Sequence, residues 1–272
     1  RYFRYKGNGR IQVCRNNGQR KLKRECTLFN YNAMGRAKEI IVKVIPSKIA
    51  NEFVKKNHYS GKVVPNSTLH FGCFLDDKLH GVMSYGSPIN KKGSINLVEN
   101  TGWNEMLELN RMAFDDYLPK YSESRCIAIS IKLIKKNAPQ IKWILSFSDG
   151  TQCGDGTIYR ASGFKLAGIA KSGQVFKFNN EVLHGKILWD RCLVTGWTVS
   201  DKEMQNLRDK GNTIERLIGN QLKYIYLIDK TCKITVPILP FSKIDEMGAG
   251  MYKGKKITLA ERQISDSSIA AN

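Results

Sequence analysis

The stretch LELNRMAFDDYLPKYSESRCIAISIKLIKK occupies residues 107–136, WILSFSD follows at 143–149, and GTIYRASGF lies at 156–164. Apolar side chains alternate at the start of the first stretch and then recur every three to four residues, which predicts a strand followed by a helix. WILSFSD has the apolar character of a buried strand, and a short helix follows it. Strand, helix, strand and helix in this order form a parallel βαβα unit. We therefore expect an α/β fold organised around residues 107–164.

The segments on either side of this unit complete the expected sheet. SKIANEFVKKN (47–57) has one apolar face and predicts a helix that Ser47 caps. HFGCFLDDKLHGVMSYG (70–86) predicts two strands joined by an Asp-Asp-Lys turn. After the unit come β-rich segments, a helical piece over 200–218 and an aromatic strand. The expected fold is α/β, with a mixed, strongly twisted sheet flanked by helices, a basic N-terminal arm and a β-rich C-terminal extension.

The charge of the chain is strongly unbalanced. Lys and Arg number 44 against 24 Asp and Glu, which gives a formal net charge of +20 and a pI near 9.7. An excess of this size favours a polyanionic partner, because each neutralised phosphate releases condensed counterions. DNA is therefore the expected partner, although ribosomal and other soluble basic proteins carry a similar charge.

The seven cysteines form no CxxC pair and show no histidine spacing of the zinc-finger kind. Most are typical of small core residues in a reducing compartment, so we expect a cytoplasmic protein. No apolar run reaches the length of a membrane span, and no signal-peptide pattern is visible, so we expect no membrane partner. The sequence leaves the oligomeric state open, a homodimer included.

The first 24 residues contain no acidic side chain and interleave Arg and Lys with Tyr and Phe. Aromatic rings between cations can stack on bases while the cations contact phosphates. A solubilising, partly disordered arm would have the same composition. The sequence predicts three regions: a basic N-terminal arm at 1–36, a catalytic core at 37–175, and a C-terminal extension at 176–272 that packs on the core and contacts DNA.

The loop DDYLPKYSES ends where the helix of the central unit begins, near Ser122. Small hydroxyl residues and flanking cations at a helix N-terminus favour an anion, because backbone N–H groups and the helix dipole point toward it. An ordinary capped helix would have the same sequence. As an anion site, this end of the helix would bind an anionic ligand, with contacts from Arg111, Lys120, Ser122, Ser124 and Arg125.

Polar residues also follow the strands of the unit, at the edge where open α/β sheets bind ligands. Ser148 and Asp149 end the second strand. In the first strand, strict alternation places Glu108 and Asn110 on one face and Arg111 on the other. These side chains are candidates for a site at the carboxyl ends of the strands.

Here the motifs resemble known families. The ending YRASGF resembles the Tyr-x-x-x-Gly-Phe ending of the GNAT superfamily of N-acetyltransferases, whose order of helix, hairpin, strand, helix, strand, helix and strand also matches. Several separated motifs over roughly residues 39–172 resemble the Mom family of phage proteins more closely. These motifs are His58-Tyr59-Ser60, Glu108-Leu109-Asn110-Arg111, Ser122-Glu123-Ser124, Ser148-Asp149 with the glycine-rich turn after it, Ile158-Tyr159-x-Ala161 and Gly163-Phe164.

Mom proteins convert adenine in phage DNA to an N6-carbamoylmethyl derivative, which protects the DNA from restriction. The resemblance therefore implies a DNA-modifying transferase that works in the host cytoplasm with acetyl-CoA or another acyl-type donor. The usual GNAT pyrophosphate loop, Gln/Arg-x-x-Gly-x-Gly/Ala, is absent, and the stretch from Lys120 to Arg125 occupies its place. The identity of the donor is thus left open. Because the exocyclic amine is paired in a duplex, the base must be flipped or taken single-stranded.

The resemblance also implies roles for individual residues. Tyr159 would protonate the leaving group or stack on the base, and its alternative is a core aromatic residue. His58, beside Tyr59, would act as a base on the adenine amine, or would bind iron together with Asp149, although the spacing demands no metal. Glu108 would act as a base through water or pair with the nearby arginine. The remaining substrate contacts would be Ser60, Asn110 and Ser148.

Two other functions remain compatible with the sequence. One is a GNAT-like acyltransferase that acts on a hypermodified pyrimidine or a protein amine. The other is a catalytically degenerate scaffold that only binds DNA. Lys223, Tyr224 and Tyr226 on the aromatic strand could extend a DNA surface, but a half-buried strand explains them as well.

Overall fold

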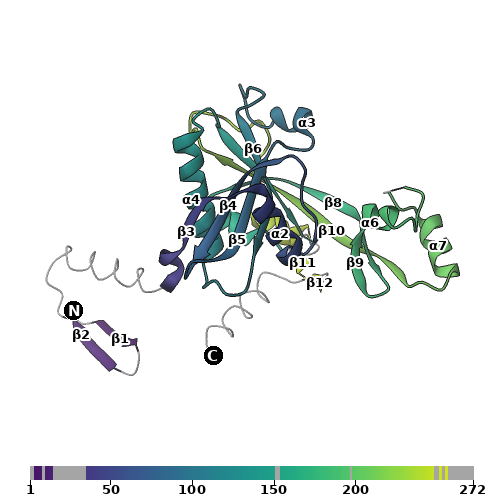
Figure 1. The fold of residues 1–272 in the computed structure, drawn as a ribbon, viewed down its shortest axis with the longest axis horizontal. Helices are drawn as coiled ribbons and strands as arrows, with labels where there is room; N and C mark the ends of the chain where they lie inside the picture. The colour runs from purple at the N-terminus through teal and green to yellow at the C-terminus, as the bar shows by residue number, and fades with distance from the viewer. Residues whose placement is uncertain are drawn as a thin grey trace.

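One mixed sheet of eight strands organises the chain (Figure 1). The computed structural model describes residues 3–7, 10–14, 35–150, 154–196, 198–247, 251–252 and 255–256. The strand order is β3-β4-β5-β6-β7-β10-β8-β9. In chain order these strands are β3 (Ile41–Val44), β4 (Ser67–Leu75), β5 (Lys78–Gly86), β6 (Met106–Phe114), β7 (Trp143–Asp149), β8 (Lys165–Phe178), β9 (Glu181–His184) and β10 (Ile214–Leu227).

The helices and two short strand pairs complete the described residues. Each pair is antiparallel: β1 (Phe3–Gly7) with β2 (Arg10–Cys14), and β11 (Met251–Tyr252) with β12 (Lys255–Lys256). Apart from β1, β2 and residues 35–36, the basic arm that the sequence predicts lies outside the described residues. The helices are η1 (Gly35–Glu39), α2 (Ser47–Asn57), α3 (Lys91–Ile95), α4 (Ser122–Asn137), α5 (Thr157–Ala161), α6 (Gly185–Asp190), α7 (Asp201–Asp209) and α8 (Ser242–Glu246).

The predicted βαβα unit is confirmed as β6, α4, β7 and α5. β6 and β7 are parallel, with Met106 opposite Trp143 at the start of the ladder. Ile127, Ile131 and Ile134 of α4 recur at helical spacing and are buried, so this isoleucine stripe packs on the sheet. The order of helix, hairpin, strand, helix, strand, helix and strand that the GNAT resemblance implies is also observed, from α2 to β8.

The predicted hairpin is confirmed as β4 and β5. Asp76 and Asp77 both have left-handed backbone angles, with φ of 51° and 60°. Two such residues in a row match the twist of antiparallel strands, and aspartate tolerates this conformation better than most residues. The turn therefore fixes the register of the hairpin, in which Leu75 pairs with Lys78.

Helices cover both faces of the sheet, and each face has its own apolar contacts. On one face, α4, α5 and α8 contribute to the largest core cluster through Ile127, Tyr159 and Ile244. On the other face, Ala50 and Val54 of α2 pack against strands β5 and β6. The sheet is therefore a middle layer that separates two environments.

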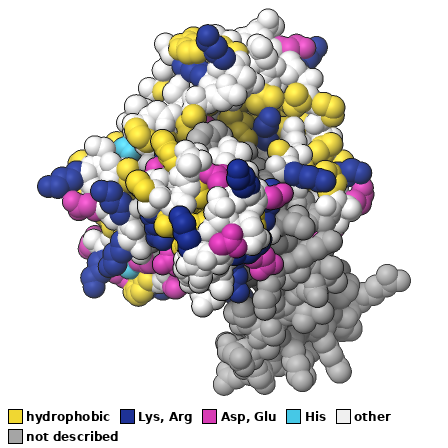
Figure 2. All heavy atoms as spheres, turned by 90° about the vertical axis from the view of Figure 1, so that its right-hand side faces the viewer, with side chains coloured by type: hydrophobic (Ala, Val, Ile, Leu, Met, Phe, Trp, Pro, Cys, Tyr) yellow, Lys and Arg dark blue, Asp and Glu magenta, His cyan; other side chains and the backbone are white. Residues whose placement is uncertain are grey.

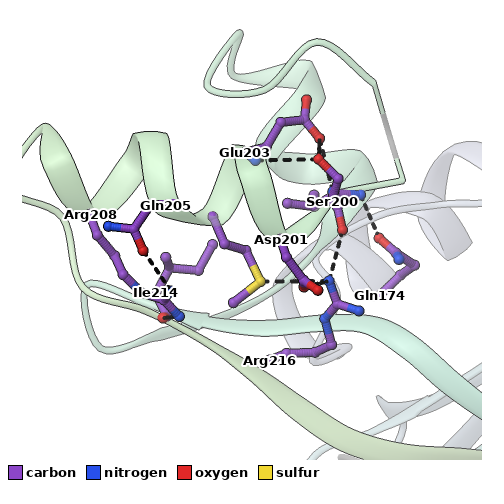
Figure 3. A network of polar contacts seen from close by, with 10 residues as sticks. Gln174, Ser200, Asp201, Glu203, Gln205, Arg208, Ile214 and Arg216 are labelled. Atoms are coloured by element: carbon purple, nitrogen blue, oxygen red, sulfur yellow. Dashed lines mark hydrogen bonds and ion pairs between the residues drawn. The ribbon is translucent and has the colours of Figure 1, made fainter.

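The far end of the sheet forms a smaller lobe with a separate core (Figure 1). There β9, α6 and α7 lie beyond the main body, against the ends of β8 and β10. A capping box starts α7, in which Ser200 accepts from the Glu203 backbone and Glu203 reaches back to the Ser200 backbone (Figure 3). Arg216 of β10 ties this helix to the sheet through Asp201, at 2.8 Å.

Three sequence predictions are corrected here. The helix expected over 200–218 ends at Asp209, because Gly211 adopts φ of +82° and the following apolar residues belong to β10. Helix α2 is preceded by Pro46 as its cap residue, so Ser47 is already helical and makes no cap hydrogen bond. The boundary expected at residue 175 falls inside β8, and β10 lies between β7 and β8, so the region 176–272 supplies part of the central sheet.

Among the helices of the described residues, none combines the length and the apolar character that crossing a bilayer requires.

Candidate active site

A bulge in β6 arranges the candidate site. Ser84 of β5 lies opposite Arg111, but the next pair joins Tyr85 to Leu109, so Asn110 is the extra residue. Before the bulge, Leu109 faces α4; after it, Met112 faces α4 and Ala113 faces α2. The alternation predicted from the sequence is therefore wrong beyond Leu109. The bulge puts Arg111 on the same face as Glu108, whereas strict alternation would separate them.

The ladder between β6 and β7 ends at the same level. Their parallel register runs from Met106 opposite Trp143 to Leu109 opposite Ser146, and the Ser146 hydroxyl donates to the Leu109 carbonyl at 3.2 Å. Beyond this point the register has no further pair, although both strands continue and are fully described. β6 and β7 are therefore no longer paired beyond Leu109, which is where the bulge interrupts β6. At this point the residues of the two faces come next to each other.

On the α2 face, the loop after α2 brings His58 to Arg111. The Arg111 Nε donates to the Lys62 carbonyl at 2.9 Å, and its Nη1 donates to the Asn110 carbonyl at 2.7 Å. Burial, with a smaller contribution from the Arg111 charge, lowers the pKa of His58 to about 4. The imidazole is therefore neutral at physiological pH.

The hydrogen bonds of His58 fix its tautomer. The backbone N–H of Ser60 donates to Nδ1 at 3.1 Å, and the Ser60 hydroxyl lies 2.8 Å from the same atom. A neutral ring whose Nδ1 accepts a backbone N–H carries its proton on Nε2. His58 therefore presents a donor rather than a base. Tyr59 lies beside it with ring centroids 4.2 Å apart and remains 53% exposed.

Glu108 has the base-like electrostatics on this face. Burial raises its pKa to about 7, although Arg111 and a backbone hydrogen bond from Ile89 both act to lower it. A carboxylate with a pKa near the working pH suits general-base catalysis. At the bulge itself, the Asn110 Oδ1 accepts from the Ser67 hydroxyl at 2.9 Å. Its buried Nδ2 has no partner among the described residues.

Asp149 ends β7 on the face of Glu108 and Arg111, since it continues the alternation of Trp143 and Leu145. Its charge acts to raise the pKa of His184, while burial has the larger effect and lowers that pKa overall. The side chain of His184 caps α6 by accepting from the Lys186 backbone at 3.1 Å.

Two residues near Asp149 and the loop after α2, His184 and Lys62, were not predicted from the sequence. His184 carries no motif, and its place near Asp149 depends on the fold of the β9–α6 segment. Lys62 joins the loop after α2 to the same segment through Asp190 of α6, at 2.8 Å. No local pattern in the sequence could have indicated either contact. Lys62 and Asp190 lie 128 residues apart, and Asp149 and His184 belong to different strands, β7 and β9.

On the α4 face, the helix N-terminus differs from an ordinary capped one. Tyr121 precedes α4 with φ of +70°, and no described side chain caps the first turn. The hydroxyl of Ser122 donates to the Pro119 carbonyl, and that of Ser124 donates to the Tyr121 carbonyl at 3.2 Å. The Ser122 N–H also donates to the Pro119 carbonyl, at 3.3 Å. Both hydroxyls and this N–H thus bind the preceding loop, which leaves the backbone N–H groups of Glu123 and Ser124 as the donors for an anion.

The two cations of that stretch are placed differently. The Arg125 Nη2 donates to the Lys38 carbonyl at 3.0 Å, so its guanidinium is bound to the η1 segment. Its buried Nε has no partner among the described residues. Lys120 is exposed in the loop before the helix.

Tyr159 lies on the α4 face inside the main core cluster. Its ring packs 5.4 Å from Phe164 and 5.2 Å from Tyr224. The turn after α5 is set by Gly163, whose φ is +82°, and by the Phe164 N–H, which donates to the Tyr159 carbonyl at 3.0 Å. Ser148 on the neighbouring strand is buried and donates to the Gly154 carbonyl at 3.3 Å.

The sheet therefore divides the predicted site residues into two groups. The α2 face gathers one group, and the α4 face the other, with Asn110 at the bulge between them. The first group is His58, Tyr59, Ser60, Glu108, Arg111 and Asp149; the second is Lys120, Ser122, Ser124, Arg125, Ser148 and Tyr159. In the part of the chain that the structure describes, no group of three or more His, Cys, Asp or Glu side chains could hold a metal ion.

Comparison with known proteins identifies the family. The family described as the Mom protein family matches residues 39–243, which is most of the chain. This chain belongs to the Mom protein family. A methylcarbamoylase, Mom of Escherichia phage Mu, is 36% identical over 137 residues, which cover 50% of this chain and 56% of that protein. The Mom relative is thus matched over little more than half of its length.

Solved acetyltransferases are similar at lower identity. One from Bacillus subtilis in complex with CoA is 9% identical, with a TM-score of 0.40 over 69% of this chain and 98% of that one. A GNAT acetyltransferase from Elizabethkingia anophelis with acetyl-CoA bound is 11% identical, with a TM-score of 0.40 over 69% and 97%. A spermidine/spermine N-acetyltransferase from Vibrio cholerae is 8% identical, with a TM-score of 0.42 over 72% and 97%.

Proposed function

We propose that this protein is a DNA-modifying transferase that places a carbamoylmethyl-like group on the exocyclic N6 of adenine in phage DNA, which protects the DNA from restriction. The single observation that carries the proposal is membership of the Mom family, whose match spans both groups of candidate residues. The methylcarbamoylase of phage Mu is the relative whose activity motivates the choice of reaction.

The acceptor base occupies the α2 face in this proposal. The exposed ring of Tyr59 offers a stacking surface for an extrahelical base, and the Nε2–H of His58 donates to it. Glu108, whose pKa of about 7 matches the working pH, takes the proton that N6 loses. This assignment gives the role of base to Glu108 rather than to His58, because the Nδ1 of His58 already accepts from Ser60.

An acyl-type donor, acetyl-CoA or another of that chemistry, occupies the α4 face. The uncapped first turn of α4 and the exposed Lys120 offer N–H groups and a cation to its anionic part. The Nδ2 of Asn110, which has no partner in the part of the chain that the structure describes, lies at the bulge, where it can donate to the donor's carbonyl oxygen. With acetyl-CoA, N6 would attack the thioester carbonyl carbon, the C–S bond would break, and the product would carry only an acetyl group. A carbamoylmethyl group requires a donor whose methylene carbon bears both the carboxamide and the leaving group; N6 attacks that carbon and the bond from it to the leaving group breaks. In either case Tyr159 supplies the proton that the leaving group takes.

Nucleoside mass spectrometry tests the proposal. Plasmid DNA from cells that express the protein should contain a deoxyadenosine derivative that is absent from cells with an empty vector. The mass increment of that nucleoside also reports which group the donor supplies. Unmodified deoxyadenosine beside intact, soluble protein would exclude the proposed reaction. A modified pyrimidine in the same digest would favour the acyltransferase alternative instead.

The role of Tyr159 has its own test. The Tyr159→Phe variant removes only the hydroxyl of a side chain that is 8% exposed, so the packing against its neighbours should persist. We expect the modified fraction of adenine to fall by a factor of about 100, within the range for loss of a general acid, with little change in melting temperature. The matched control is Tyr117→Phe, which removes an exposed hydroxyl that donates to Asp76. Equal activity of both variants would show that Tyr159 is a core residue only.

A further inference from the structure

One apolar side chain projects beside the candidate base. Ile89 is 82% exposed, more than any other large hydrophobic side chain of the described residues. It lies in the short connection between β5 and α3, three residues after Gly86, which is paired with Glu108 in the sheet. A single exposed isoleucine is ordinary on a protein surface; the relevant feature of Ile89 is its place beside the candidate site.

The connection that carries Ile89 is held on both sides. Before it, the Asn66 side chain donates to the Ser87 carbonyl, and Pro88 is buried. A Cβ on Gly86 would lie 2.0 Å from the Asn66 carbonyl oxygen, so the backbones are in close contact there. After it, the Asn90 side chain caps α3 by accepting from the Gly93 backbone at 3.0 Å. The isoleucine is thus presented by a fixed backbone.

Cations follow immediately. Lys92 is exposed, and the Lys91 Nζ lies 4.4 Å from the ring centroid of Trp103. Trp103 is itself 53% exposed, so Ile89 and this ring form a small apolar surface bordered by Lys91 and Lys92. Apolar side chains beside cations fit a duplex, whose bases stack and whose phosphates flank them. The chemistry of the connection therefore selects DNA as its occupant.

We propose that Ile89 is the wedge that enters the base stack at the step from which the target adenine is extruded, while Lys91 and Lys92 contact the flanking phosphates. This inference rests on the proposed function, since it assumes an adenine that must leave a duplex. Apolar side chains of this size hold a kinked or opened base step by replacing the lost stacking contacts. The connection that carries Ile89 starts at Gly86, which is paired with Glu108, so extrusion and proton removal occur at neighbouring points of the protein.

The experiment compares Ile89→Ala with the unchanged protein on two substrates: a duplex oligonucleotide and its target strand alone. A wedge is needed only where a stack must be opened, so the rate on the duplex should fall on the order of tenfold or more. The rate on the single strand should stay within about twofold, because an unpaired base needs little opening. The control is Ile41→Ala, which truncates a 58% exposed isoleucine. Ile41 lies on the edge strand β3, where it pairs with Phe74 of β4, so its truncation should change neither rate.

Each outcome of this comparison either supports or overturns the role of Ile89 as a wedge. An equal loss on both substrates, or no loss on either, would overturn the wedge. If the unchanged protein modifies neither substrate, the proposed function fails, and the fluorescence of 2-aminopurine at the target position then tests the wedge alone. This probe brightens when its base leaves the stack. Brightening that Ile89→Ala abolishes and Ile41→Ala retains would support extrusion by Ile89 without any reaction, and brightening unchanged by Ile89→Ala, or none in any protein, would overturn it.

Discussion

At the scale of single residues, the pKa of Glu108 makes the sharpest prediction about pH. A base must be ionised to accept a proton, so a pKa of about 7 means that the modification rate rises roughly tenfold per pH unit below 7 and levels off above it. His58 adds no limb in this window, since its pKa is about 4. The Glu108→Gln variant should be slow and lose the limb, whereas Glu99→Gln, at an exposed site, should keep it.

The same pKa has a consequence for stability with a definite sign. The folded pKa of Glu108 lies above the model-peptide value of 4.5, so the folded state binds more protons than the unfolded state between about pH 4.5 and 7. The free energy of unfolding should therefore decline as the pH rises through this window, relative to Glu108→Gln. Urea unfolding of both proteins at several pH values measures the difference, and parallel curves would contradict the raised pKa.

The motifs indicated candidate residues, but the protonation and burial of their side chains could not be predicted from them. His58 was expected as a base, and only the contact from the Ser60 backbone shows that its Nδ1 is occupied. Tyr224 was a candidate for a DNA surface, yet it is fully buried because β10 lies inside the sheet. The tautomer of a ring and the burial of a strand both depend on residues distant in the chain, which a local pattern does not contain.

At the scale of elements, the capping box of α7 predicts a measurable contribution to stability. Ser200→Ala removes the side chain that accepts from the Glu203 backbone and should lower the free energy of unfolding by about 1 kcal/mol. Ser47→Ala is the matched control, because Ser47 is the first residue of α2 and makes no cap hydrogen bond. Urea titrations followed by circular dichroism compare the two, and an equal loss would show that capping is not the cause.

Elements with one strong period could be predicted closely. The strand WILSFSD was expected at 143–149 and is β7 over the same residues, and the isoleucine stripe places α4 where it is found. The bulge at Asn110 has no such signal, since a single inserted residue leaves the apolar pattern of β6 almost unchanged. The prediction that this helix reaches residue 218 was wrong. The apolar residues after Gly211 continue the apolar spacing of the helix, although the backbone there belongs to strand β10.

At the scale of the whole molecule, composition predicted a basic protein but not where its charge lies. The face seen in Figure 2 carries many Lys and Arg side chains with acidic ones among them. In the lobe of β9, α6 and α7, several of these cations are neutralised by close carboxylates, as in Lys186–Asp190, Arg191–Glu181 and Arg216–Asp201. The C-terminal extension, which was expected to contact DNA, therefore offers less free positive charge than the sequence count implies.

The net charge of +20 does not show which surface would contact DNA. The salt dependence of DNA binding, compared between lysine variants, locates that surface. Each phosphate contact adds about 0.9 to the slope of log affinity against log salt concentration. Lys92 follows the proposed wedge, so Lys92→Ala should flatten the slope by about one unit. Lys202→Ala, on the exposed side of α7, should leave the slope unchanged. Fluorescence anisotropy with a labelled duplex at several salt concentrations gives both slopes. If Lys202→Ala flattened the slope and Lys92→Ala did not, the DNA would lie on the lobe, and the α3 side of the sheet would not be its binding surface.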